Sequence, residues 1–129
     1  MKPVVIGMLA VLLGGCGKSP PVLSGGKPVA YWVRVVQGPD ARLRRQAAFK
    51  LGNVGPADAA AFPALVEALK DADAGVRREV ILALIKFGPA AREVGPALAE
   101  LRQQDPDERV RTCAARALAR IEQANRQTE

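Results

Sequence analysis

The chain has 129 residues and a formal net charge of +6; 49% of its residues are hydrophobic, yet only 4% are aromatic. This length suits one domain, whose core would be built from Ala, Leu and Val. Histidine is absent, which removes the commonest general base and imidazole metal ligand, and no Cys-x-x-Cys, Gly-rich phosphate loop or Gly-x-Ser-x-Gly motif occurs. We therefore expect a protein that is not an enzyme and that uses no metal and no cofactor.

The N-terminus has the architecture of a secretory signal, because Lys2 is followed by an apolar run over residues 4–13 and by small residues before Cys16. The run is shorter than the about 20 residues that a membrane-spanning helix needs. The segment Leu13-Gly-Gly-Cys16 resembles the bacterial lipoprotein signal. That resemblance implies removal of residues 1–15 as a signal peptide and lipidation of Cys16, which would anchor the exported protein to the bacterial cell membrane or outer membrane. An ordinary cleaved signal with an incidental cysteine is the alternative.

Residues 16–27 are rich in Gly, Ser and Pro and show no apolar period, so we expect the lipidated cysteine to be followed by a flexible tether. The part of this segment after Cys16 extends at most about 35 Å, which keeps the domain near its membrane. With Cys16 lipidated, Cys113 has no partner for an internal disulfide. Cys113 lies on the apolar side of a predicted helix, and we interpret it as a small buried hydrophobic residue.

Beyond the tether, one pattern recurs every 33 or 34 residues, headed in turn by Asp40, Asp73 and Asp107. Three residues after each aspartate come an apolar residue and an arginine, and further apolar residues follow at helical spacing. Aspartate caps helix N-termini, and the Gly-Pro pairs at 55–56 and 88–89 end helices. A fixed period in the thirties is typical of stacked helix pairs. The three predicted pairs are 28–37 with 40–53, 59–70 with 73–87, and 91–104 with 107–124.

This pattern resembles the HEAT repeat, especially the short HEAT-like form of phycobilisome lyase-type proteins, with Pro-x-Leu in the first helix and Asp, Val-Arg and Ala-Leu in the second. Residues 63–84 and 96–118 match it well, and residues 30–51 carry a divergent copy with Trp32 at the position of Leu65. The resemblance implies an all-α fold, namely a short α-solenoid of about three HEAT-like antiparallel helix pairs. The expected divisions are a repeat domain over residues 28–124 and a frayed C-terminus over residues 125–129.

Three arginines, Arg44, Arg77 and Arg111, occupy equivalent positions in the repeats and would stack as a ladder along the solenoid. In HEAT-like arrays such arginines usually pair with aspartates, which implies a structural ladder. The partners that this resemblance implies are Asp40, Asp73 and Asp107. The close carboxylate pairs at 71/73 and 105/107 could suggest weak calcium binding, but capped turns explain them better.

The additional arginines include Arg42, Arg45 and Arg78, which are candidates for a partner-binding stripe that faces an acidic protein, a polymer or a membrane. Export argues against nucleic acid as the partner. Tyr31 and Trp32 form the one cluster of large aromatic residues. Trp32 either covers the open end of the core or contributes, with Tyr31, to a partner-binding hot spot.

Together these features predict a membrane-tethered HEAT-repeat lipoprotein that acts as a non-catalytic protein-interaction scaffold at the cell envelope. Its second helices would line a shallow face, and rim arginines would steer an acidic protein partner. One alternative is an enzyme or enzyme subunit of the bilin-lyase-like class, or a binder of an envelope polymer. A purely structural domain is the other. The sequence leaves the oligomeric state open.

Overall fold

The computed structural model describes residues 20–129, so the predicted signal peptide (1–15), Cys16 and residues 17–19 lie outside the described part of the chain. A short antiparallel hairpin, in which Leu23 pairs with Pro28, precedes six α-helices in this part. In chain order the elements are β1 (Leu23–Ser24), β2 (Lys27–Pro28), α1 (Val29–Val35), α2 (Ala41–Val54), the 3-10 helix η1 (Gly55–Ala57), α3 (Ala61–Ala68), α4 (Ala74–Leu84), the 3-10 helix η2 (Ile85–Val94), α5 (Gly95–Gln104) and α6 (Glu108–Arg126).

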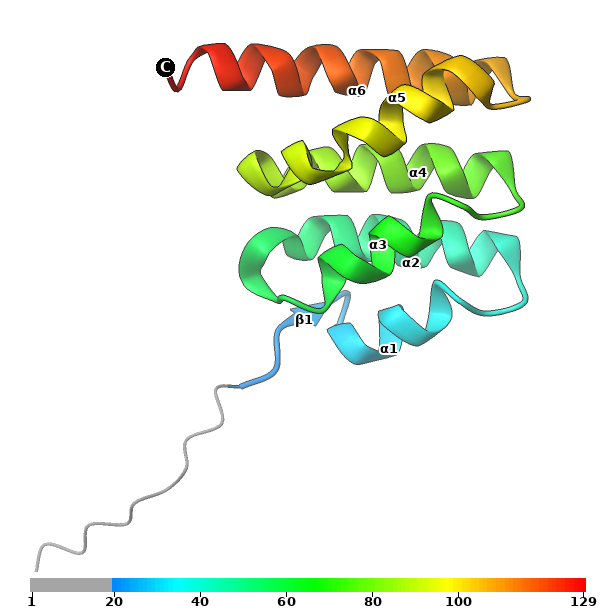
Figure 1. The fold of residues 1–129 in the computed structure, drawn as a ribbon. Helices are drawn as coiled ribbons and strands as arrows, with labels where there is room; N and C mark the ends of the chain where they lie inside the picture. Colours follow the sequence, from blue (N-terminus) through cyan, green and yellow to red (C-terminus); the bar gives the residue numbers. More distant parts are fainter. Residues whose placement is uncertain (1–19) are drawn as a thin grey trace, which may run out of the picture.

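The six helices form three antiparallel pairs, α1 with α2, α3 with α4, and α5 with α6 (Figure 1). The second helices of the pairs, α2, α4 and α6, lie side by side in one layer, and the first helices cover one side of that layer. This arrangement confirms the predicted all-α fold, a short solenoid of helix pairs. No helix within residues 20–129 is both long and apolar enough to span a bilayer.

Each second helix begins at the aspartate that the sequence pattern indicates. The carboxylates of Asp40, Asp73 and Asp107 accept hydrogen bonds of 2.8–3.3 Å from backbone N–H groups in the first turns of α2, α4 and α6. These N–H groups have no acceptor within their own helix, so the caps stabilise the helix starts. After α2 and α4 the chain turns at Gly55 and Gly88, whose φ angles of 56° and 61° are left-handed and suit glycine.

The core between the two layers consists mainly of aliphatic side chains, with Trp32 and Phe87 also buried in it. The largest fully buried ones are Leu51, Leu65, Ile81, Leu84, Leu98, Val76, Val80 and Val110. The first repeat departs from this pattern, because Leu43, at the position of Val76 and Val110, is 49% exposed. α2 packs tightly on α4 at Gly52, where an added Cβ would lie 2.7 Å from the Cβ of Ala83. Residue size therefore sets the spacing of the second helices.

The end of the predicted tether is folded onto the first repeat, so the boundary expected at residue 28 is wrong. Ser24 is buried, and its hydroxyl donates a 2.9 Å hydrogen bond to the backbone O of Lys50 in α2. The indole Nε1 of Trp32 in turn donates to the backbone O of Ser24 at 2.8 Å. The hairpin therefore caps the N-terminal end of the solenoid. At the other end, α6 continues to Arg126, two residues beyond the predicted domain limit.

Candidate partner-binding face

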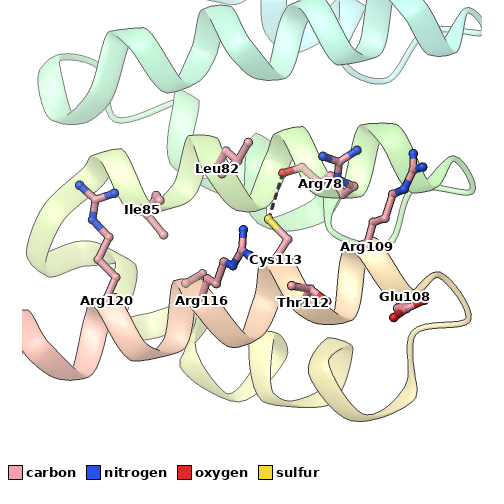
Figure 2. A pocket seen from close by; sticks show the side chains of 10 residues that line it. Arg78, Leu82, Ile85, Glu108, Arg109, Thr112, Cys113, Arg116 and Arg120 are labelled. Carbon is pink, nitrogen blue, oxygen red and sulfur yellow. Dashed lines mark hydrogen bonds between the residues drawn. The ribbon is translucent and has the colours of Figure 1, made fainter.

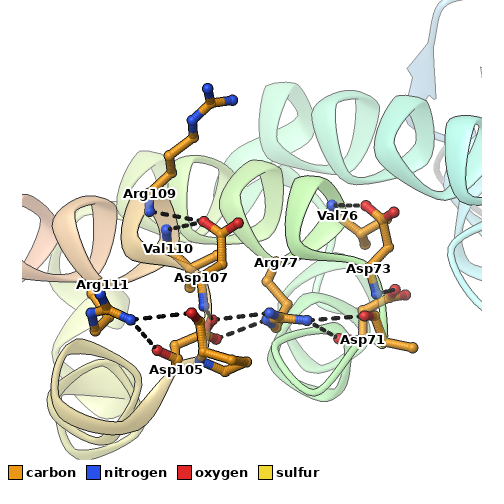
Figure 3. Close-up of polar contacts among 11 residues, drawn as sticks. Asp71, Asp73, Val76, Arg77, Asp105, Asp107, Arg109, Val110 and Arg111 are labelled. Carbon is orange, nitrogen blue, oxygen red and sulfur yellow. Dashed lines mark hydrogen bonds and ion pairs between the residues drawn. The ribbon is translucent and has the colours of Figure 1, made fainter.

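Two of the three equivalent arginines bridge neighbouring helix pairs. Arg77 on α4 donates to the carboxylate of Asp105 from Nε at 2.8 Å and from Nη2 at 3.0 Å. Its Nη1 donates to the backbone O of Asp71 at 2.8 Å, so Arg77 lies between two successive loops (Figure 3). Arg44 on α2 binds the carboxylate of Asp71 in the same bidentate way, at 2.8 and 3.0 Å. Each arginine therefore ties its own repeat to the next one.

The pairing predicted for this ladder is wrong, because the carboxylate partners are Asp71 and Asp105 rather than Asp40, Asp73 and Asp107. The second aspartate of each Asp-x-Asp sequence is occupied as a helix cap. The first aspartate accepts the arginine of the preceding repeat and also the backbone N–H of the second aspartate, at 2.9 Å in both loops. The two aspartates of one loop thus have different roles, one between repeats and one within a repeat.

Arg111 is the last member of the ladder. Its Nη1 donates to the backbone O atoms of Asp105 and Pro106, at 2.7 and 3.2 Å, which repeats the contacts of Arg77 with its own loop. The ion pairs within residues 20–129 are those of Arg44 and Arg77, so Arg111 has no carboxylate partner there. Arg111 consequently holds one loop, whereas Arg77 holds two.

The ladder contacts favour the charged form of both carboxyl groups. Burial by itself raises the pKa of Asp105, but hydrogen bonds from Arg77 and from the N–H of Asp107, with the arginine charges, outweigh burial and lower that pKa below its ordinary value. The pKa of Asp71 is lowered by the same balance, with Arg44 as the donor. In the described part of the chain no group of three potential metal ligands gathers. The ladder ties neighbouring repeats together through charge-assisted hydrogen bonds.

A second set of cationic side chains lies on the side of the α2, α4 and α6 layer that the first helices leave uncovered. We name this surface the basic face. Its cationic residues are Arg42 and Arg45 on α2, Arg78 on α4, Lys86 on η2, and Arg109, Arg116 and Arg120 on α6. Two acidic residues, Glu79 and Glu108, also line its hollows. Positive charge therefore dominates this surface, and none of its cations forms an ion pair within residues 20–129.

The basic face is hollowed between α4 and α6 by an open groove of about 560 Å³. Leu82 and Ile85 contribute apolar surface from the α4 side, and Arg116 and Arg120 line the groove from α6 (Figure 2). Smaller hollows continue from this groove towards α2, where the exposed Phe49 lies. The groove thus offers a partner an apolar strip beside unpaired arginines.

Cys113 lies in the wall of this groove and is half-buried. Its Sγ is 3.9 Å from the backbone O of Arg78, and burial raises the pKa of the thiol. The positive charges of Arg78 and Arg116 act in the opposite direction but offset burial only in part. The thiol is protonated at neutral pH, which is unfavourable for a nucleophile.

The other large groove of the described chain lies between α3 and α5 and has a different electrostatic character. Its volume is about 460 Å³, and its lining includes Glu67, Lys70 and Glu100 together with the ladder pair Arg77 and Asp105. Cations and anions alternate there, and the arginine is already paired. The excess of positive charge is therefore a property of the second helices.

The structure separates the residues that the sequence grouped as partner-binding candidates. Arg42, Arg45 and Arg78 line hollows of the basic face, whereas Tyr31 and Trp32 lie on α1 in the other layer. Trp32 is only 6% exposed and is held by the hairpin, so it covers the core and does not belong to an exposed hot spot.

Tyr31 remains partly exposed beside Trp32. The two rings meet edge to face with centroids 4.9 Å apart, and Lys27 Nζ lies 5.4 Å from the Tyr31 ring centroid.

The apolar residues of the basic face were not predicted from the sequence. Phe49 and Leu82, which are 44% and 42% exposed, could have been found there as large apolar residues outside the core-facing stripes.

Comparison with known protein families agrees with this architecture. Residues 30–119 match the family model described as HEAT repeats, a span that begins in α1 and ends in α6. A search among curated proteins finds no sequence that matches this chain. HEAT repeats suggest a protein-interaction scaffold, and their match covers all three helix pairs. The chain belongs to the HEAT-repeat family.

Proposed function

We propose that the protein is a membrane-tethered lipoprotein whose HEAT repeats act as a non-catalytic scaffold for an acidic protein partner at the cell envelope. The basic face carries this proposal. Arg44 and Arg77 are paired within the ladder, but the arginines of the basic face have no carboxylate partner within residues 20–129. Four of them line a groove that also exposes Leu82 and Ile85. Unpaired cations around apolar surface favour binding of a partner that brings carboxylates of its own.

The lipid anchor would determine how this face is presented. If Cys16 carries lipid, the chain between Cys16 and Val22, where the folded part begins, extends at most about 20 Å. The hairpin contacts α2 and α1, so the described part of the chain starts at the first repeat (Figure 1). The first repeat would then lie nearest to the membrane, and the α4–α6 groove would lie farther from it, accessible to a protein.

The lowered pKa values of two carboxyl groups fit the structural role that a scaffold gives them. Among residues 20–129 the carboxyl groups with a clear shift are Asp71 and Asp105, and their pKa values are lowered by arginine contacts. These two groups serve the packing of repeats rather than proton transfer.

The test is a crosslinked capture experiment with native envelopes, read by mass spectrometry. The bait is the full-length protein, and the variant is Arg42→Glu, Arg45→Glu and Arg78→Glu combined. We expect a recurrent acidic protein that the variant no longer captures. The matched control makes the same charge change on exposed residues outside the basic face, namely Arg34→Glu, Lys70→Glu and Arg102→Glu, and should retain the partner.

A Cys16→Ala variant tests the anchor in the same experiment. Loss of lipidation should release the protein from the membrane fraction and reduce capture. Equal capture by the variant of the basic face and by its control would refute the role of that face. A Cys16→Ala protein that still fractionates with membranes would refute the lipid anchor.

A further inference from the structure

The centre of the basic face carries the apolar side chains of Leu82 and Ile85 beside Arg78, and its two flanks are cationic. We propose that this surface holds one acidic amphipathic helix of the partner, lying along α4 with its apolar stripe on Leu82 and Ile85. The inference deepens the proposed scaffold function and rests on it.

The apolar side chains of the basic face form one strip. Leu82 and Phe49 are 42% and 44% exposed, although both are large hydrophobic residues on well-packed helices. Leu82 and Ile85 line both the α4–α6 groove and the neighbouring hollow, which also contains Phe49. Removing such side chains from water is favourable, so the strip favours a partner that brings apolar groups.

The cations flank this strip on both sides. On α6 the arginines at positions 109, 116 and 120 are spaced by seven and four residues, and all three line the groove. This spacing places them on one face of the helix. On α2, Arg42 and Arg45 line the hollow on the other side of α4. A partner that lies over α4 therefore meets mainly positive charge along both edges, with Glu79 as the acidic residue on the α2 side.

The length of the groove suits about three turns of helix. From Arg109 to Arg120 the α6 backbone advances about 16 Å, at 1.5 Å per residue. An amphipathic helix of that length carries apolar residues at i, i+3 or i+4, and i+7, which is the pattern of helix-in-groove recognition. Carboxylates on the sides of the same helix would reach the arginines of α6 and α2.

A flat anionic membrane fits this surface less well. Headgroups would meet the ends of the arginine side chains, but Leu82 and Ile85 line a groove rather than a flat surface. A membrane would therefore draw little affinity from the apolar strip. Dependence of binding on Leu82 distinguishes the two kinds of partner.

The experiment uses the full-length protein in a non-ionic detergent and a fluorescent synthetic peptide of Leu, Ala and Glu. Its leucines form one helical stripe, and its glutamates lie on both sides of that stripe. Fluorescence anisotropy should show binding that weakens with added salt. A peptide of the same composition with a scrambled stripe should bind at least about tenfold more weakly. A peptide with Lys in place of Glu should not bind.

Variants then test the two components separately. Leu82→Gln should weaken binding by roughly tenfold while leaving its salt dependence unchanged. Arg116→Gln with Arg120→Gln should weaken binding and reduce the salt dependence. Leu23→Gln and Arg34→Gln are the matched controls, because both residues are exposed outside the basic face, and they should bind as the native protein does. Each substituted residue is exposed, so circular dichroism should show an unchanged fold.

Two outcomes would overturn the inference. One is equal binding of the ordered and scrambled peptides. The other is binding of phosphatidylglycerol vesicles in preference to the peptide, with no effect of Leu82→Gln, because the surface would then recognise anionic lipid. If the peptide does not bind while envelope capture still depends on Arg42, Arg45 and Arg78, the proposal of a helical partner is refuted and the proposed scaffold function stands. If envelope capture fails as well, both proposals are refuted.

Discussion

The two aspartates that flank Pro106 should contribute very differently to stability, although they are close in sequence. The side chain of Asp105 is 2% exposed and that of Arg77 is 11% exposed. Asp105→Ala removes the acceptor of two guanidinium hydrogen bonds and leaves the charge of Arg77 buried. Breaking a buried pair in this way costs about 3–5 kcal/mol. Asp107→Ala removes only a helix cap, which costs about 1 kcal/mol.

The assay is urea unfolding followed by far-UV circular dichroism. The dependence of the free energy of unfolding on urea concentration (the m-value) is compared between variants to check that each unfolds in a single transition. A domain of this size has about 5–15 kcal/mol of stability, so Asp105→Ala removes a large share of it. Asp105→Asn is a milder variant that should leave the protein folded. The asparagine keeps an oxygen acceptor for the Asp107 N–H but loses the negative charge. We expect Asp105→Asn to lower the free energy of unfolding by about 1.5–3 kcal/mol, the range for hydrogen bonds to charged groups.

A double-mutant cycle locates the partner of Arg77 directly. Arg77→Ala combined with Asp105→Ala should show a coupling energy of about 2 kcal/mol or more, because the two side chains share their contacts. Arg77→Ala combined with Asp107→Ala should be additive within about 0.5 kcal/mol. Arg111→Ala should cost less than Arg77→Ala, because Arg111 contacts one loop only. Equal losses for the two aspartates, or stronger coupling of Arg77 to Asp107, would refute this account of the ladder.

Three further predictions concern acid stability, helix spacing and the hairpin. The pKa of Asp105 is lowered in the folded state, so its contribution is complete above the unfolded value of about 3.9 and is lost as the pH falls through the folded value; urea midpoints should drop below about pH 4, and less steeply in Asp105→Asn. Gly52→Ala should destabilise by about 1–3 kcal/mol through overpacking against Ala83, measured by thermal unfolding, and an increase in stability would contradict the close contact. Trp32→Phe removes the donor to Ser24 O, so limited proteolysis should cut faster near the hairpin than in the native protein; unchanged cleavage would show that the indole does not hold it.

Local sequence determined the helix pairs, because their signals act over a few residues. The apolar spacing around Val76 and Val80, the caps at Asp73 and Asp107, and the turn at Gly88 depend on contacts within one turn of chain. These features were predicted in the right order, with helix limits within a few residues of those observed. The 33- to 34-residue repetition then predicted stacking, since one pair alone cannot bury its apolar face.

Tertiary structure alone decided which aspartate each arginine binds. Arg77 and Asp105 are 28 residues apart, and their contact depends on how two repeats stack. Asp105 and Asp107 lie two residues apart in the loop between α5 and α6, so the sequence offers both as partners of Arg77. The stacking register brings Asp105 to the guanidinium, while Asp107 turns to the N-terminus of α6. Residue spacing carries no information on this choice.

The hairpin and the groove could not be predicted from the sequence, for the same physical reason. A Gly-, Ser- and Pro-rich segment has the composition of a linker, and only the Lys50 carbonyl and the Trp32 indole, from other elements, hold Ser24 in place. Likewise, Leu82 on α4 becomes part of a groove only when α6 lies beside it. Local sequence signals specify the helices and their repetition. Packing between repeats decided the ion pairs, the capped end and the shape of the basic face, because each depends on groups that are distant in the chain.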